Sequence, residues 1–132
     1  MPGFSESGVC RAPAVEVWKL LYDPGRYMEW WTGTERVQIG AGGVSRYVPD
    51  APGFAYPTAI ATTGAGEHVT ISCLLTDIVY EWTLEPHPPG CAVRLRVEIP
   101  EALADKLAGQ LRDMQDAFAR LVAVAEREAG VA

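Results

Sequence analysis

Four side chains of this sequence are of types that could move protons beside a bound organic molecule: Arg46, Tyr56, His68 and Tyr80. Histidine changes its charge near neutral pH, and a tyrosine hydroxyl or an arginine guanidinium donates hydrogen bonds to an oxygen that gains charge. None of the four lies in a known catalytic motif. Their role therefore depends on whether the folded chain brings them to one cavity.

His68 has two interpretations. In the first, it shares the parity of Thr70 and Ser72 along a predicted strand, and this polar row lines a cavity. In the second, Val69 and Ile71 point to the core while His68 faces water, which is the usual arrangement for an alternating strand. The sequence leaves both interpretations open.

The sequence lacks the residue patterns that several other kinds of chemistry need. By strand alternation Glu81, Glu85 and Glu98 fall on the solvent face, so they do not form the paired carboxylates of an acid–base site. His87 stands among prolines and is expected in an exposed turn, so the two histidines are too isolated to define a metal site. The sequence also has neither a serine-hydrolase elbow nor a glycine-rich phosphate loop. We expect no metal and no cofactor.

The composition excludes two kinds of partner. The 132 residues are 48% hydrophobic and 21% charged, which is ordinary for one globular domain spanning residues 1–132. The net charge is −6 and the basic residues are scattered singly, so no patch can neutralise a row of phosphates. No apolar run approaches the roughly 20 residues of a membrane span. We therefore expect neither a nucleic-acid partner nor a spanning segment.

The cysteines and the first residues bear on the compartment. Cys10, Cys73 and Cys91 form an odd set without metal-ligand spacing, as expected of small free thiols in a reducing compartment. Residues 1–6 have neither the basic start nor the apolar stretch of a signal peptide. The expected location is the cytoplasm.

The spacing of apolar residues divides the chain into helices and strands. After an extended start at residues 5–11, Pro13 and an apolar stripe predict a helix that ends near Tyr22. Asp23 can accept a hydrogen bond from free N–H groups, which predicts a second short helix through about Trp31. From residue 34 the period changes to two. We expect a loop at residues 49–57 and strands at residues 35–39, 43–48, 58–63, 67–75, 78–85 and 92–99.

The last two strands carry the clearest alternation. One face holds only apolar side chains, namely Tyr80, Trp82, Leu84, Val93, Leu95, Val97 and Ile99. A register that keeps both faces consistent places Glu81 opposite Arg96 and Thr83 opposite Arg94.

Residues 100–129 are predicted to form one long helix with Gly130 as its C-terminal cap. Apolar residues recur along it at spacings of four and three, at Leu107, Leu111, Met114, Phe118, Leu121 and Ala125. This stripe must be buried, and the apolar face of the sheet is its expected partner. A two-stranded coiled coil, and with it a homodimer, is the alternative. Gly109 inside the helix permits either a bend or a close contact with the sheet.

Taken in order, these elements resemble the START-like, Bet v 1-like superfamily, also called the polyketide cyclase/dehydrase and lipid-transport family. The resemblance rests on residues 12–18 at the first helix, Asp23 with Tyr27 and residues 30–31, the run at residues 80–86, and residues 97–100 before the long helix. It implies an α+β helix-grip fold, with two short helices after the first strand and a curved antiparallel sheet around the C-terminal helix.

The resemblance also implies a cavity between the sheet and the long helix that binds lipids, sterols, polyketides or other apolar molecules. The expected ligand contacts are one tryptophan of the second short helix, side chains of the predicted loop and strands, and two residues of the helical stripe. They are Trp30, Tyr47, Phe54, Tyr56, His68, Tyr80, Trp82, Met114 and Phe118.

Three functions follow from the resemblance. The first is binding of a small hydrophobic ligand without chemistry, and the second is a polyketide cyclase/aromatase-like enzyme that uses the same cavity. The third is a protein-interaction module, which an exposed apolar patch around Trp31 and Phe54 would favour. Polar groups converging inside the cavity would favour catalysis, whereas an entirely apolar cavity would favour carriage.

Overall fold

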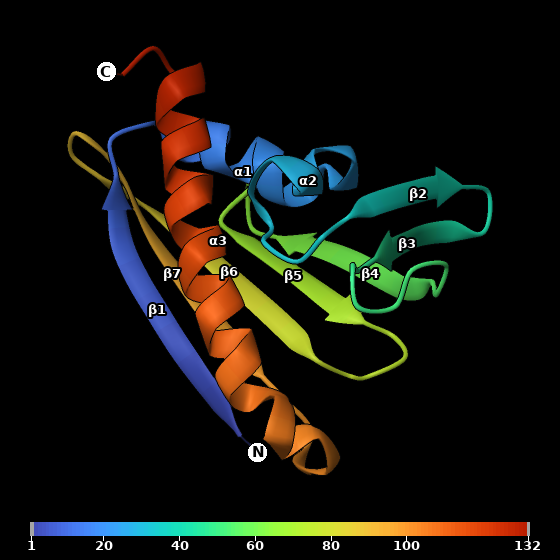
Figure 1. Ribbon diagram of the computed structural model, residues 1–132. Coiled ribbons are helices and arrows are strands. Elements are labelled where there is room, and N and C mark those ends of the chain that lie inside the picture. The colour runs from blue at the N-terminus through green and yellow to red at the C-terminus, as the bar shows by residue number, and fades with distance from the viewer. Residues whose placement is uncertain (1, 132) are drawn as a thin grey trace.

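The computed structural model describes residues 2–131 as a curved antiparallel sheet with one long helix across its concave face. Figure 1 shows this helix, α3 (Leu107–Glu128), running diagonally over β1 (Gly3–Cys10), β6 (Val79–His87) and β7 (Gly90–Glu98). The short helices α1 (Ala14–Tyr22) and α2 (Tyr27–Trp30) lie beside the C-terminal half of α3. This arrangement confirms the predicted helix-grip α+β fold.

Seven strands form the sheet in the order β1-β7-β6-β5-β4-β3-β2, and each strand is antiparallel to its neighbours. The first strand therefore pairs with the last, and β2 forms the opposite edge. The remaining elements are η1 (Pro24–Arg26), β2 (Arg36–Gly40), β3 (Gly43–Tyr47), β4 (Tyr56–Thr63), β5 (His68–Cys73) and η2 (Glu101–Lys106).

The hairpin of β6 and β7 has the predicted register. Glu81 lies opposite Arg96, and Thr83 lies opposite Arg94. The seven apolar side chains assigned to the inner face are buried, and none is more than 3% exposed. The alternation of this hairpin is strict, so a shift by one residue would move its whole apolar set into water, and the register follows from the sequence.

Two of the predicted loops are shorter in the structure. Pro86 and His87 continue β6 and pair with Cys91 and Gly90, so His87 is the last strand residue rather than a turn residue. Tyr56 already belongs to β4, where it pairs with Arg46. Both extensions contain a proline, whose missing N–H made strand pairing look unfavourable from sequence alone.

The helical corner after β1 is held together by its own side chains. The Asp23 carboxylate accepts a hydrogen bond from the Gly25 N–H at 2.9 Å, as the predicted cap requires. The Tyr27 hydroxyl donates to the carbonyl of Leu21 at 2.8 Å, and Trp30 Nε1 donates to the carbonyl of Leu20 at 3.0 Å. Two carbonyls near the end of α1 thereby gain partners, which fixes α2 against it.

The C-terminal helix differs from its prediction at its start. Residues 101–106 form a 3-10 segment in which Leu103 leaves the helical region at φ −113° and ψ 20°, and α3 begins only at Leu107. The interruption lies at Leu103, whose side chain packs against the core, and not at Gly109. Gly130 has a φ of +76°, as expected of the predicted cap.

The apolar stripe of α3 is buried along only part of its length. Met114, Leu121 and Ala125 are fully buried between the helix and the sheet, whereas Leu107 and Leu111 are half-buried. Packing of α3 against the sheet of the same chain explains why its apolar stripe is buried. A coiled coil is not needed to bury the stripe, and the homodimer stays a prediction. Toward its N-terminal end the helix stands away from the sheet, and a cavity lies between them. Among residues 2–131, no helix combines the length and hydropathy that a membrane-spanning helix needs.

Candidate functional site

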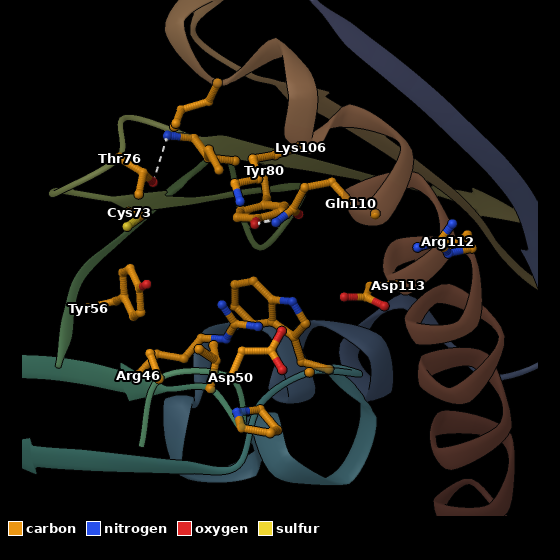
Figure 2. Close-up of a pocket in the computed structure, with 18 of the residues that line it drawn as sticks. Arg46, Asp50, Tyr56, Cys73, Thr76, Tyr80, Lys106, Gln110, Arg112 and Asp113 are labelled. Carbon is orange, nitrogen blue, oxygen red and sulfur yellow. Dashed lines mark hydrogen bonds between the residues drawn. The ribbon is translucent and has the colours of Figure 1, made fainter. Parts of the chain in front are cut away.

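The cavity has a volume of about 640 Å³ and opens to solvent on one side. The first turns of α3, together with η2, form one wall, and the inner faces of β3 to β6 form the other. The loops that follow α2 and β3 complete it. Residues far apart in the sequence therefore meet here, and Figure 2 shows side chains from the two walls directed toward the same space.

Tyr80 and Gln110 connect the two walls. The Tyr80 hydroxyl donates a hydrogen bond to Gln110 Oε1 at 2.9 Å, shown dashed in Figure 2. Tyr80 is 3% exposed, and its burial raises the pKa of the phenol to about 12. At neutral pH this hydroxyl is a neutral donor and not a base.

Arg46 supplies a partly buried positive charge. It stands on β3 at the parity that faces the cavity, and its guanidinium carbon lies 4.1 Å from the centre of the Trp31 ring. Its Nε donates to Thr34 Oγ1 at 2.6 Å. Desolvation lowers the pKa of Arg46, but a guanidinium stays protonated in the neutral range. Within residues 2–131 its two terminal nitrogens have no hydrogen-bond acceptor and form no ion pair.

Gly33 marks the point where Arg46 approaches the helix. A Cβ built on Gly33 would lie 3.4 Å from Asp113 Oδ2 and 3.7 Å from Arg46 Nη2. Gly33 has a φ of +91°, a conformation that glycine adopts without strain. Both charged groups therefore lie beside Gly33, but they do not form an ion pair of 4 Å or less with each other.

Other charged side chains border the open side of the cavity. Asp50, Asp105, Lys106 and Arg112 line it and are exposed, as is Asp113. Their charges are screened by solvent, whereas that of Arg46 is partly removed from it. In the described part of the chain, residues with metal-binding side chains do not gather in a group of three or more that could hold a metal ion.

Two of the nine predicted ligand contacts line the cavity, Tyr56 and Tyr80. Trp30 lies one layer deeper and stacks on Trp31 at 5.5 Å between ring centres. Trp31 rather than Trp30 is therefore the tryptophan at the cavity wall. Phe54 is 48% exposed, and its ring centre lies 5.0 Å from that of Tyr56.

The predicted contacts farther along the helix belong to the core. Trp82 is 1% exposed, Met114 is fully buried, and neither lines the cavity. Phe118 is half-buried, and its ring centre lies 5.9 Å from that of Trp82. Close packing of the helix on the sheet begins at Met114, so the cavity ends before these residues.

Tyr47 and His68 lie on the other face of the sheet. Tyr47 is covered by Arg36, whose guanidinium carbon is 3.6 Å from the ring centre. Its hydroxyl donates to Gln38 Oε1 at 3.1 Å. His68 is exposed, with Nδ1 3.5 Å from Thr83 Oγ1, in agreement with the second interpretation of this strand. Strand parity separates both residues from the cavity.

Sequence reasoning did not single out Gln110, Asp113 or Cys73 as cavity residues. Gln110 had a usable signal, because it lies three residues after Leu107 and so interrupts the apolar side of the helix with an amide. The sequence indicates Arg46 only as a candidate for proton chemistry. Arg46 has the same strand parity as Val44 and pairs with Tyr56, so its side chain lies on the inner face of the sheet.

Comparisons with solved structures agree with this fold. A protein from Nitrosomonas europaea superposes with a TM-score of 0.73 at 12% identity, and the match covers 96% of this chain and 95% of that one. A protein from Chromobacterium violaceum gives 0.72 at 20% identity, covering 96% and 99%. At these identities the likeness shows the fold alone.

A third similar structure is the di-domain ARO/CYC StfQ from the steffimycin biosynthetic pathway. It has a TM-score of 0.72 and 15% identity, with 98% of this chain matched to 52% of StfQ. No curated protein matches the chain. The profile of one family matches residues 1–126. The chain belongs to the polyketide cyclase/dehydrase and lipid transport family.

Proposed function

We propose that this protein binds a small, largely apolar molecule in the cavity between the sheet and the first turns of α3. The observation that carries the proposal is the cavity itself, since about 640 Å³ lies within the range of small-molecule sites. Such sites combine apolar walls with a few polar groups that fix orientation. Trp31, Ile71 and Ile78 supply apolar wall here, and Arg46 and Tyr80 supply polar groups.

The binding hypothesis can be tested on the purified protein. Native mass spectrometry followed by extraction should recover a co-purified small molecule, and lipids or aromatic polyketides should raise the melting temperature. Repeated recovery of no ligand, together with no thermal shift across such a panel, would contradict the proposal.

Gly109 offers a variant that closes the cavity. Gly109 lines it, and a Cβ built there meets no atom within 4 Å. The phenyl ring of Gly109→Phe is therefore expected to occupy the cavity while α3 stays helical. The matched control is Ala119→Phe, which adds the same ring to an exposed position of α3 away from the cavity. Loss of binding in the control alone, or in neither variant, would argue against this cavity as the site.

A polyketide cyclase-like enzyme is the second candidate, and one observation favours it. Polar groups from both walls converge in the cavity: the amide of Gln110 on the helix wall and, on the sheet wall, the guanidinium of Arg46 and the hydroxyl of Tyr80. Arg46 has free donors, and the Tyr80 hydroxyl becomes one when it turns away from Gln110, so both could stabilise an oxygen gaining negative charge. Incubation with a reactive poly-β-keto chain tests this role: a product ratio different from that in buffer, lost in Tyr80→Phe, would support catalysis.

The interaction module has less support. Trp31 is 3% exposed, so it does not form an exposed apolar patch with Phe54. The patch that was expected to favour this function is therefore absent at these two residues.

A further inference from the structure

We propose that the ligand of this cavity is an aromatic carboxylic acid whose carboxylate pairs with the terminal nitrogens of Arg46. The inference rests on the proposed binding function and specifies its ligand. It starts from Arg46, whose guanidinium is held in place from two sides by the Trp31 ring and by Thr34. Both terminal nitrogens are left without a protein partner among residues 2–131.

An arrangement of this kind is costly unless a ligand completes it. Withdrawing a charge from water without an ion-pair partner destabilises the fold, and Arg46 is a partly buried cation whose acidic neighbour, Asp113, is exposed and forms no ion pair with it. A carboxylate presents two oxygens in one plane, which matches the two parallel donors of a guanidinium. Because the stack and the Thr34 bond already fix the side chain, little conformational entropy is lost on binding.

The carboxylates around the cavity leave room for this anion. Asp113 on α3 lies beside Gly33, as Arg46 does, and its charge favours the protonated guanidinium, but the two form no ion pair. Asp113, Asp50 and Asp105 are exposed, so solvent weakens their repulsion of a bound anion, and exposed Lys106 and Arg112 oppose it. The inner position beside Arg46 is thus the place for the negative end of a ligand.

Aromatic rings define the body of the ligand. Tyr56 pairs with Arg46 across β3 and β4, and Trp31 contacts Tyr80 at 4.9 Å between ring centres. All three rings line the cavity. Flat aromatic groups pack favourably on such surfaces by stacking or edge contacts. A planar acid can therefore place its carboxylate on Arg46 and its rings among these side chains.

The test compares acids with uncharged amides of nearly the same shape. Benzoic, naphthoic and anthracene carboxylic acids are each paired with their carboxamides, and binding to the wild-type protein is measured by calorimetry at neutral pH. At least one acid is expected to bind about tenfold more tightly than its amide, the order of a charge-assisted pair. Equal affinities throughout would overturn the carboxylate inference but leave the binding function intact. If neither acids nor amides bind, the carboxylate inference fails. The binding function fails as well only if lipids and aromatic polyketides also leave the melting temperature unchanged and no ligand is recovered.

Two arginine variants locate the effect. Arg46→Gln should remove the preference for the acid, with the amide affinity changed less than about twofold, and Arg46→Lys should restore part of it. Arg36→Gln is the matched control, because Arg36 also stacks on an aromatic ring but lies outside the cavity. A preference that survives in Arg46→Gln would contradict the proposal. If Arg46→Gln does not fold, two other measurements test the proposal. The preference for the acid over its amide should be smaller in Arg46→Lys than in wild type, and in wild type it should decrease with added salt. A preference unchanged in both measurements would contradict the proposal.

Discussion

The hydroxyl of Tyr80 donates to Gln110 Oε1 at 2.9 Å and so joins β6 to the first turns of α3 across the cavity. Tyr80→Phe removes the donor and leaves the ring in place. We expect the free energy of unfolding to fall by about 0.5–1.5 kcal/mol, the usual contribution of one hydrogen bond.

A double-mutant cycle isolates this bond. Gln110→Met removes the acceptor while keeping a side chain of similar length, and urea unfolding of both single variants and the double variant gives the coupling. Independent effects of the two substitutions, with no coupling, would show that the bond does not form in solution.

High pH should destabilise the protein through its buried tyrosines. Burial raises the pKa of Tyr80 from 10.0 to about 12, and it also raises the pKa of Tyr27. The unfolded chain releases these protons first, so the stabilisation is complete below pH 10 and is lost as the pH rises toward the folded pKa. For Tyr80 alone the loss amounts to roughly 3 kcal/mol.

Denaturant unfolding followed across the alkaline range measures this loss. Tyr80→Phe should make stability fall less steeply above pH 10. Tyr22→Phe is the control, because Tyr22 is 46% exposed whereas Tyr80 is 3% exposed. An identical pH dependence in wild type and Tyr80→Phe would mean that the phenol is not protected from solvent.

Cys73 should report occupancy of the cavity. It is a half-buried thiol in the lining, whereas Cys10 and Cys91 are fully buried. Burial also raises the pKa of both buried thiols, which reduces their reactivity. Iodoacetamide is therefore expected to label Cys73 first in the native protein.

A bound ligand should slow the labelling of Cys73 in proportion to its saturation. Peptide mass spectrometry identifies the labelled cysteine, and Cys73→Ser supplies the blank. Unchanged labelling with a ligand bound at saturation would place that ligand elsewhere.

The sequence specified the sheet better than the site, for physical reasons visible at particular residues. In β6 and β7 every second residue is apolar, so face and register could both be predicted. In β3 the apolar residues Val44 and Tyr47 occupy both parities, so the sequence did not show that Arg46 faces inward and Tyr47 outward. A strand with mixed parity leaves its faces undetermined until its neighbours are known.

The cavity wall formed by the helix could not be predicted from the sequence, for a different reason. The stripe of α3 continues through Leu107 and Leu111, and its spacing alone does not tell where the helix separates from the sheet. That separation depends on the 3-10 segment at residues 101–106 and on the loops opposite it. Tyr56 and Tyr80, two of the predicted ligand contacts, line the cavity, while Trp31 and Gln110 join them only through long-range contacts.

Two leucines on the same helix face test where that separation occurs. Leu121 is fully buried, so Leu121→Ala should lower the free energy of unfolding by about 2–5 kcal/mol through lost burial and the space left behind. Leu111 is half-buried beside the cavity end of α3, and Leu111→Ala should cost less than about 1.5 kcal/mol. Urea unfolding measures both. Because the substitution and the helix are the same, helix propensity contributes equally to the two values. Equal losses would mean that the sheet packs on the whole stripe and that the cavity is closed in solution.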